Sequence, residues 1–132
     1  MRDINLIVVH CSDSPDDRHV DAAEIHRWHL ERGFDGIGYH KVIKRDGVVE
    51  NGRPEYWSGA HAKGHNKNSL GVCLIGRDSF SDDQIVSLYY VLDDWRQKYP
   101  NAKIVGHCDL DSGKTCPNFD VNKQIKKWGF VV

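Results

Sequence analysis

Two apolar runs that each end in a histidine constrain the fold of this chain more than any other feature. Residues 4–9 lead into His10, and residues 103–106 lead into His107. Short apolar runs that contain valine and isoleucine are typical of strands. Ligand crevices of α/β folds lie outside the carboxyl ends of the strands, which is where both imidazoles are expected.

A cysteine, Cys116, follows the second histidine by nine positions. Two imidazoles and one thiolate are three ligands, the number that a catalytic zinc takes when its fourth position is left for water. Spacing alone leaves another interpretation open, in which two histidines merely end strands and the thiol is buried. The pattern indicates a small zinc hydrolase if the fold brings the two strands side by side.

Other histidines compete for this role, since eight are many for a chain of this length. His26 and His29 are three positions apart on a predicted helix, but no third ligand accompanies them. We therefore expect them to be ordinary polar or packing residues. His61 lies in an irregular segment rich in glycine and histidine, and we expect it to contact substrate rather than metal.

Length and charge limit the class of protein. The chain has 132 residues, enough for one continuous core, and we expect a single domain over residues 1–132. The formal net charge is −1, which implies no bulk attraction to nucleic acid or to a membrane surface. We find no membrane-span pattern and no signal peptide, so we expect synthesis in the cytoplasm.

Local signals predict a mixed sheet. Capping-box patterns begin at Asp21 and at Ser81, and Asp46-Gly47 between two apolar runs predicts a hairpin. We expect the α/β class with α+β character: one mixed sheet of about five strands, covered by two or three helices. The expected strands are 4–9, 39–44, 48–50, 70–75 and 103–106, and the expected helices are 22–31, 81–98 and 120–128.

The remaining cysteines do not form a disulfide framework. If Cys116 binds metal, Cys11, Cys73 and Cys108 are an odd number, and small buried apolar roles are expected for them. Cys11 and Cys108 each follow a candidate ligand. In extended backbone they would share the opposite face and lie close together, reduced in a cytoplasm.

Five ordered blocks extend the pattern over nearly the whole chain. They resemble the type-2 N-acetylmuramoyl-L-alanine amidases, the family that also contains the peptidoglycan recognition proteins, and within it the small zinc endolysins of podovirus coliphages. The blocks are residues 9–12, 38–47, 61–64, 68–76 and 114–120.

The resemblance implies specific residue roles. The zinc ligands of the family fall on His10, His107 and Cys116, its hydroxyl donor on Tyr39 and its catalytic lysine on Lys114. The histidine of the substrate cleft falls on His61. The implied fold is a mixed sheet packed by helices, with one zinc ion in an open surface groove. The implied substrate is peptidoglycan, cut between the muramic acid lactyl group and L-alanine.

Chemistry supports these roles. Negative charge grows on oxygen when a tetrahedral intermediate forms, and an ammonium at Lys114 with a hydroxyl at Tyr39 can stabilise it. Some relatives have a glutamate base where this chain has Cys73, so the base stays open between Tyr39, the metal-activated water and a loop histidine. Trp57, near the His61 loop, can offer an apolar ring face to sugar or lactyl carbons, or can serve packing alone.

Two other functions stay open. The chain can be a peptidoglycan-binding module without activity, although such modules typically lack the ligand cysteine that is present here as Cys116. The coliphage enzymes also suggest an RNA polymerase partner, which nothing in the composition supports. We expect a monomeric endolysin or prophage enzyme that reaches the wall through lysis, a holin or specialised export.

Overall fold

The computed structural model describes residues 2–130, which form one five-stranded sheet with three helices. Along the chain the elements are β1 (Leu6–Cys11), α1 (Ala22–Glu31), β2 (Lys41–Ile43), β3 (Val49–Asn51), β4 (Ser69–Leu74), α2 (Asp82–Lys98), β5 (Lys103–Gly106) and α3 (Val121–Lys127). Two 3-10 turns, η1 (Asn66–Asn68) and η2 (His107–Asp109), complete the order. The expected α/β class and element order are confirmed.

The sheet is mixed, with spatial order β3-β2-β4-β1-β5. β1 pairs in parallel with both β4 and β5, and β4 also pairs in parallel with β2. Only β2 and β3 pair antiparallel, through the hairpin at Asp46-Gly47. β1 and β5 are therefore neighbours, as the metal hypothesis requires.

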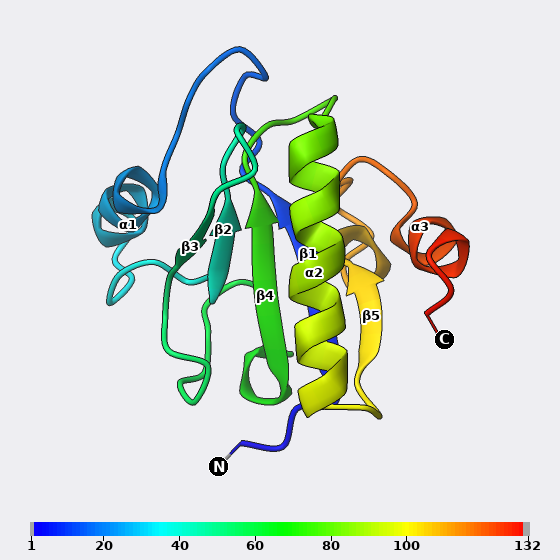
Figure 1. Cartoon of the computed structure of the whole chain (residues 1–132). Helices are drawn as coiled ribbons and strands as arrows, with labels where there is room; N and C mark the ends of the chain where they lie inside the picture. The colour runs from blue at the N-terminus through cyan, green and yellow to red at the C-terminus, as the bar shows by residue number, and fades with distance from the viewer. Residues whose placement is uncertain (1, 131–132) are drawn as a thin grey trace.

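Helices cover the two faces of the sheet unequally. In Figure 1, α2 lies in front of β1, between β4 and β5, with α3 beyond β5 and α1 at the opposite side of the sheet. Ile7 and Val9 of β1 join the larger core under α2 and α3, whereas the smaller core joins Ile25 of α1 to Val42 and the Cys73 region. His10, opposite Cys73 in the register, therefore belongs to the α1 face.

The helix starts follow the predicted capping chemistry. The Asp21 carboxylate accepts from the Glu24 N–H at 2.9 Å, and Ser81 forms a complete capping box with Gln84. The buried Gln84 amide also donates to the carbonyls of Ile43 and Ile75, which ties the start of α2 to the ends of β2 and β4.

The extended backbone assumed for Cys108 is wrong, whereas the closeness of Cys11 and Cys108 stays a prediction. β5 ends at Gly106, so Cys108 lies in the 3-10 turn η2 and not in extended backbone. The alternation that would have paired Cys11 with Cys108 therefore does not apply. The thiol that hydrogen-bonds with Cys11 is that of Cys116, whose hydrogen bond is the largest influence on the Cys11 pKa and lowers it.

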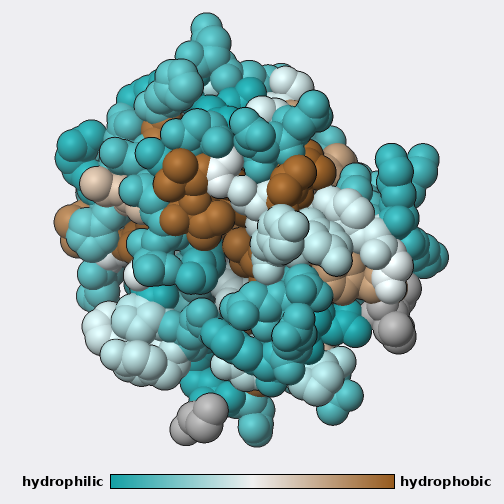
Figure 2. All heavy atoms as spheres, in the orientation of Figure 1, coloured by the Kyte–Doolittle hydropathy of each residue, from teal (hydrophilic) through white to brown (hydrophobic). Residues whose placement is uncertain are grey.

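The outer face over α2 is mostly hydrophilic in Figure 2, with apolar groups near its middle. Val86 and Tyr90 of α2 are more than half exposed. Within residues 2–130, no helix has the length and apolar character needed to cross a membrane.

Two buried histidines hold backbone groups beside the sheet. Nδ1 of His29 accepts the Gly38 N–H at 2.9 Å, and Nδ1 of His40 accepts the Gly71 N–H at 3.1 Å. Burial lowers the pKa of each imidazole to about 4. Protonation of either Nδ1 would place its N–H opposite the backbone N–H that it now accepts, and the hydrogen bond would be lost.

The metal-free protein should therefore lose stability as the pH falls from about 6.5 toward 4. The unfolded histidine has a pKa of about 6.5, so in this window the unfolded state binds more protons and the free energy of unfolding decreases with falling pH. Urea denaturation across the window measures the slope. His40→Asn, whose amide oxygen can still accept from Gly71, should reduce the slope, and the exposed His19→Asn should not. Equal slopes in all three proteins would contradict this origin.

Candidate metal centre

A groove of about 1,030 Å³ opens where β1 and β5 end. His10, His107 and Cys116 lie in its lining, together with Tyr39 and Lys114. The groove thus lies at the carboxyl ends of parallel strands, the position expected for a ligand site in an α/β sheet.

Three potential ligands converge in this groove. One ligand atom each from His10, His107 and Cys116 lies within 4.8 Å of the other two. Ligand atoms around a tetrahedral zinc are about 3.5 Å apart, so modest shifts would close the site. Two imidazoles and a thiolate without a carboxylate are a donor set that suits zinc.

Local backbone contacts hold the cysteine in place. The N–H of Cys11, the last residue of β1, donates to Sγ of Cys116 at 2.8 Å. The N–H of Cys108 donates to the Cys116 carbonyl at 2.9 Å. Both histidine-bearing elements therefore anchor the loop that carries the third ligand.

The site keeps its imidazoles neutral. Burial, followed by the neighbouring His61 and His107, lowers the pKa of His10 well below its usual value. Burial and the nearby Lys114 ammonium lower the pKa of His107. The hydrogen bond with the Cys11 side chain, followed by burial, raises the pKa of Cys116, and the Cys11 backbone N–H acts in the opposite direction. The neutral imidazoles are ready to bind a metal, but the thiol must release its proton.

Tyr39 lies against the first ligand. Its ring centroid is 5.1 Å from that of His10 and 5.5 Å from that of His29. Burial, together with the surrounding cysteines, raises the pKa of the Tyr39 hydroxyl well above its usual value. The hydroxyl thus stays protonated near neutral pH and can donate a hydrogen bond.

Lys114 lies at an exposed part of the groove. It follows the turn after η2, where its N–H donates to the Asp111 carbonyl at 3.0 Å. Its side chain is exposed in the groove and close enough to His107 to lower the pKa of that imidazole. An exposed ammonium at this position can approach a ligand in the groove.

The two predicted substrate residues lie in different places. His61 lines the groove but is only 9% exposed, and both its ring nitrogens have partners within the protein. Trp57 is 55% exposed and lines a separate hollow of about 410 Å³ with His26 and Arg53. The structure therefore does not bring Trp57 together with the metal ligands.

Sequence reasoning missed a supporting residue on α1. His29 lines the groove, and its bond to the Gly38 N–H holds the segment that leads into Tyr39. His26 accepts the Ile37 N–H in the same way. The three-residue spacing on the helix was the available signal, and it indicates two backbone acceptors rather than a metal pair.

Cys73 occupies the interior beneath the site. Its side chain is fully buried, and burial raises the pKa of its thiol well above the usual value. A neutral, buried thiol is a poor proton acceptor. Cys73 therefore does not take the part of the glutamate base found in some relatives.

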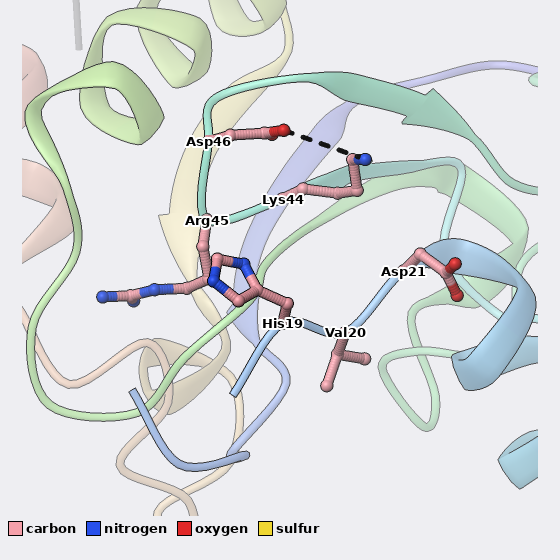
Figure 3. A pocket seen from close by; sticks show the side chains of 6 residues that line it. All are labelled: His19, Val20, Asp21, Lys44, Arg45 and Asp46. Carbon is pink, nitrogen blue, oxygen red and sulfur yellow. Dashed lines mark ion pairs between the residues drawn. The ribbon is translucent and has the colours of Figure 1, made fainter. Parts of the chain in front are cut away.

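A smaller hollow of about 130 Å³ lies between residues 19–21 and 44–46 (Figure 3). Lys44 and Asp46 form an ion pair at 3.9 Å across the hairpin turn. His19 and Asp21 line its other side. None of the three candidate metal ligands lines this hollow.

Comparison with known proteins agrees with the geometry. Residues 1–119 match the family model described as N-acetylmuramoyl-L-alanine amidase. The endolysin of Escherichia phage T7 is 42% identical over 94% of this chain and 84% of its own length. The endolysin of Enterobacteria phage K11 is 40% identical over 89% of this chain and 83% of its own length.

A solved structure shows the same architecture. The N-acetylmuramoyl-L-alanine amidase LysC from Clostridium intestinale superposes with a TM-score of 0.89 at 29% identity, covering 98% of this chain and 88% of its own. The family match over most of the chain, the endolysin relatives and the shared fold agree. The chain belongs to the N-acetylmuramoyl-L-alanine amidase family.

Proposed function

We propose that this amidase holds one zinc ion with His10, His107 and Cys116 and uses it to hydrolyse peptidoglycan. The bond cut is the amide between the lactyl group of N-acetylmuramic acid and L-alanine of the stem peptide. The observation that carries the proposal is the convergence of three ligand atoms within 4.8 Å in a groove that also contains Tyr39 and Lys114. Family membership supplies the reaction class.

The donor atoms determine what the site can supply. A bound zinc ion polarises an amide carbonyl and lowers the pKa of water to about 7. His10 and His107 bind in their neutral form, and the Cys11 N–H stabilises the thiolate of Cys116 through its 2.8 Å hydrogen bond.

Tyr39 and Lys114 act on the charge that develops during the reaction. The Lys114 ammonium stabilises the carbonyl oxygen as it becomes negative in the tetrahedral intermediate. The Tyr39 hydroxyl, kept protonated by its raised pKa, donates a hydrogen bond and can pass a proton to the leaving amine. The hydrogen bond between the Gly38 N–H and His29 holds the segment that leads into Tyr39.

Substrate contacts extend beyond the metal ligands. His61 forms part of the groove lining. The exposed face of Trp57 can stack on a sugar ring of a glycan that continues past the groove. We expect the enzyme to act on the cell wall, as endolysins do; no feature of residues 2–130 favours an RNA polymerase partner.

The purified protein should contain one zinc ion per chain. His10→Ala, His107→Ala and Cys116→Ala should each abolish tight binding, because each removes one of three protein ligands. Metal analysis after dialysis measures the content. Cys108→Ala is the matched control, since its backbone bond to Cys116 is unaffected and its thiol is outside the ligand set. Full zinc occupancy in Cys116→Ala would remove that residue from the site.

Tyr39→Phe and Lys114→Ala should keep zinc and fold but lose turnover. Removal of one donor to a developing oxyanion typically costs roughly 10²–10³ in rate. Initial rates on purified peptidoglycan, normalised to zinc content, give the measurement. Tyr90→Phe and Lys126→Ala change exposed residues of the same types and should be silent. Near-normal rates in the zinc-loaded Tyr39 and Lys114 variants would refute their roles.

Digestion of peptidoglycan should release new L-alanine amino termini and leave glycan strands intact. A glycosidase would instead use two carboxylic acids across the sugar bond. A chelator should stop the reaction, and added zinc should restore it. New reducing sugars that continue to form after zinc removal would show a different activity, and binding without any product would indicate a recognition module.

A further inference from the structure

Three buried side chains, Ser69, His61 and His10, form a hydrogen-bonded row that ends at a candidate metal ligand. Ser69 Oγ lies 3.1 Å from Nε2 of His61, and Nδ1 of His61 lies 2.9 Å from Nε2 of His10. Ser69 is 0%, His61 9% and His10 1% exposed. We propose that His61 and Ser69 are positioning residues that fix the tautomer and orientation of His10 for metal binding; this inference rests on the proposed function.

The fold provides a fitted slot for the His61 ring. A Cβ atom at Gly71 would lie 2.7 Å from Cγ of His61, and one at Gly59 would lie 2.6 Å from its Cδ2. Neither distance is tolerated between real atoms, so only glycine at these two positions leaves room for the ring. The imidazole is therefore confined between two backbone segments.

The loop that carries His61 is also pinned. Oδ1 of Asn66 accepts the N–H of His61 at 2.9 Å and the N–H of Ala62 at 3.0 Å. Ser69 begins β4, next to β1, so its hydroxyl lies on the sheet rather than on a loop. A rigid strand residue and a pinned loop residue together orient the ring of His10.

Hydrogen-bond accounting gives the direction of the row. A neutral imidazole has one N–H and one bare nitrogen. Because Nε2 of His10 is engaged with His61, Nδ1 is the nitrogen left for a metal, and it must be bare. Nε2–H of His10 then donates to Nδ1 of His61, and Nε2–H of His61 donates to Ser69 Oγ. This assignment pairs both nitrogens of His61 and leaves Nδ1 of His10 free for a metal.

The reverse direction would disable the ligand. If Nδ1–H of His61 donated to Nε2 of His10, the proton of His10 would lie on Nδ1, where it would block the metal. A metal on Nδ1 of His10 requires the productive direction, and the Ser69 hydroxyl, which can donate or accept, accommodates it by accepting the Nε2 proton of His61. Partners of this kind behind a ligating histidine typically contribute 10–100-fold to metal affinity.

The interaction also separates two roles of His61. A residue that only touches substrate changes KM and leaves zinc affinity unchanged. A positioning residue changes the dissociation constant for zinc in the absence of substrate. Zinc binding to the metal-free chain is therefore the decisive measurement.

The test is competition titration of Zn²⁺ between the metal-free protein and a chromophoric chelator. His61→Leu should raise the zinc dissociation constant 10–100-fold. His61→Asn, whose Oδ1 can accept from Nε2–H of His10, should recover most of the loss. Ser69→Ala should fall between wild type and His61→Leu. The exposed His65→Leu, in the same loop, is the matched control and should equal wild type.

Two further readouts make the outcome decisive. Circular dichroism of each metal-free variant checks the fold, and if His61→Leu does not fold, the smaller Ser69→Ala change carries the test. In the zinc-loaded wild type, imidazole ¹⁵N NMR should show His10 with its proton on Nε2. A proton on Nδ1 of His10, or equal zinc affinity in folded His61→Leu and His65→Leu, would overturn the inference.

Failure of the inference can be told apart from failure of the proposed function. If Cys116→Ala abolishes zinc binding while His61→Leu and Ser69→Ala do not weaken it, the metal site stands and the positioning role is wrong. If the wild-type protein itself does not bind zinc, the proposed metal site fails and the positioning role fails with it.

Discussion

The parallel pairing of β1 with β4 and β5 builds the groove. It places the carboxyl ends of three strands side by side, so residues separated by about a hundred positions meet there. β1 contributes His10, and the turn after β5 contributes His107 and then Cys116. Without this pairing the three ligand atoms could not lie within 4.8 Å of one another.

Several buried histidines of this molecule have neutral imidazoles. His29 and His40 use their bare Nδ1 atoms to accept backbone N–H groups, and His61 connects a ligand to the sheet. The low pKa of each imidazole follows chiefly from desolvation. Neutral imidazoles can be buried beside the candidate metal site at a lower cost than charged ones. They also add no positive charge that would repel a metal cation.

The groove combines rigid and adaptable parts. Its ligand side is built on β1 and on backbone hydrogen bonds between Cys11, Cys108 and Cys116. Lys114 lies on an exposed turn that also lines the groove. The candidate ligands thus lie on a strand and on hydrogen-bonded backbone, and the ammonium lies on a loop at the surface.

Local signals in the sequence were enough to predict the secondary structure and to propose the ligands. Apolar runs, capping residues at Asp21 and Ser81 and the Asp46-Gly47 turn are local signals, and they sufficed because local chemistry decides where such elements start and end. The resemblance of five ordered blocks identified the family before any geometry was known. The convergence of His10, His107 and Cys116 was a hypothesis until the strand order was known.

Contacts between distant segments became known only from the three-dimensional arrangement of the chain. Sequence spacing could not show that Cys116, rather than Cys108, hydrogen-bonds with Cys11, because the 3-10 turn after Gly106 ends the strand alternation. It also could not show that both nitrogens of His61 are engaged inside the protein, since one partner lies 51 residues away and the other lies across a loop. Hydrogen-bond partners between distant segments depend on packing, which no local pattern encodes.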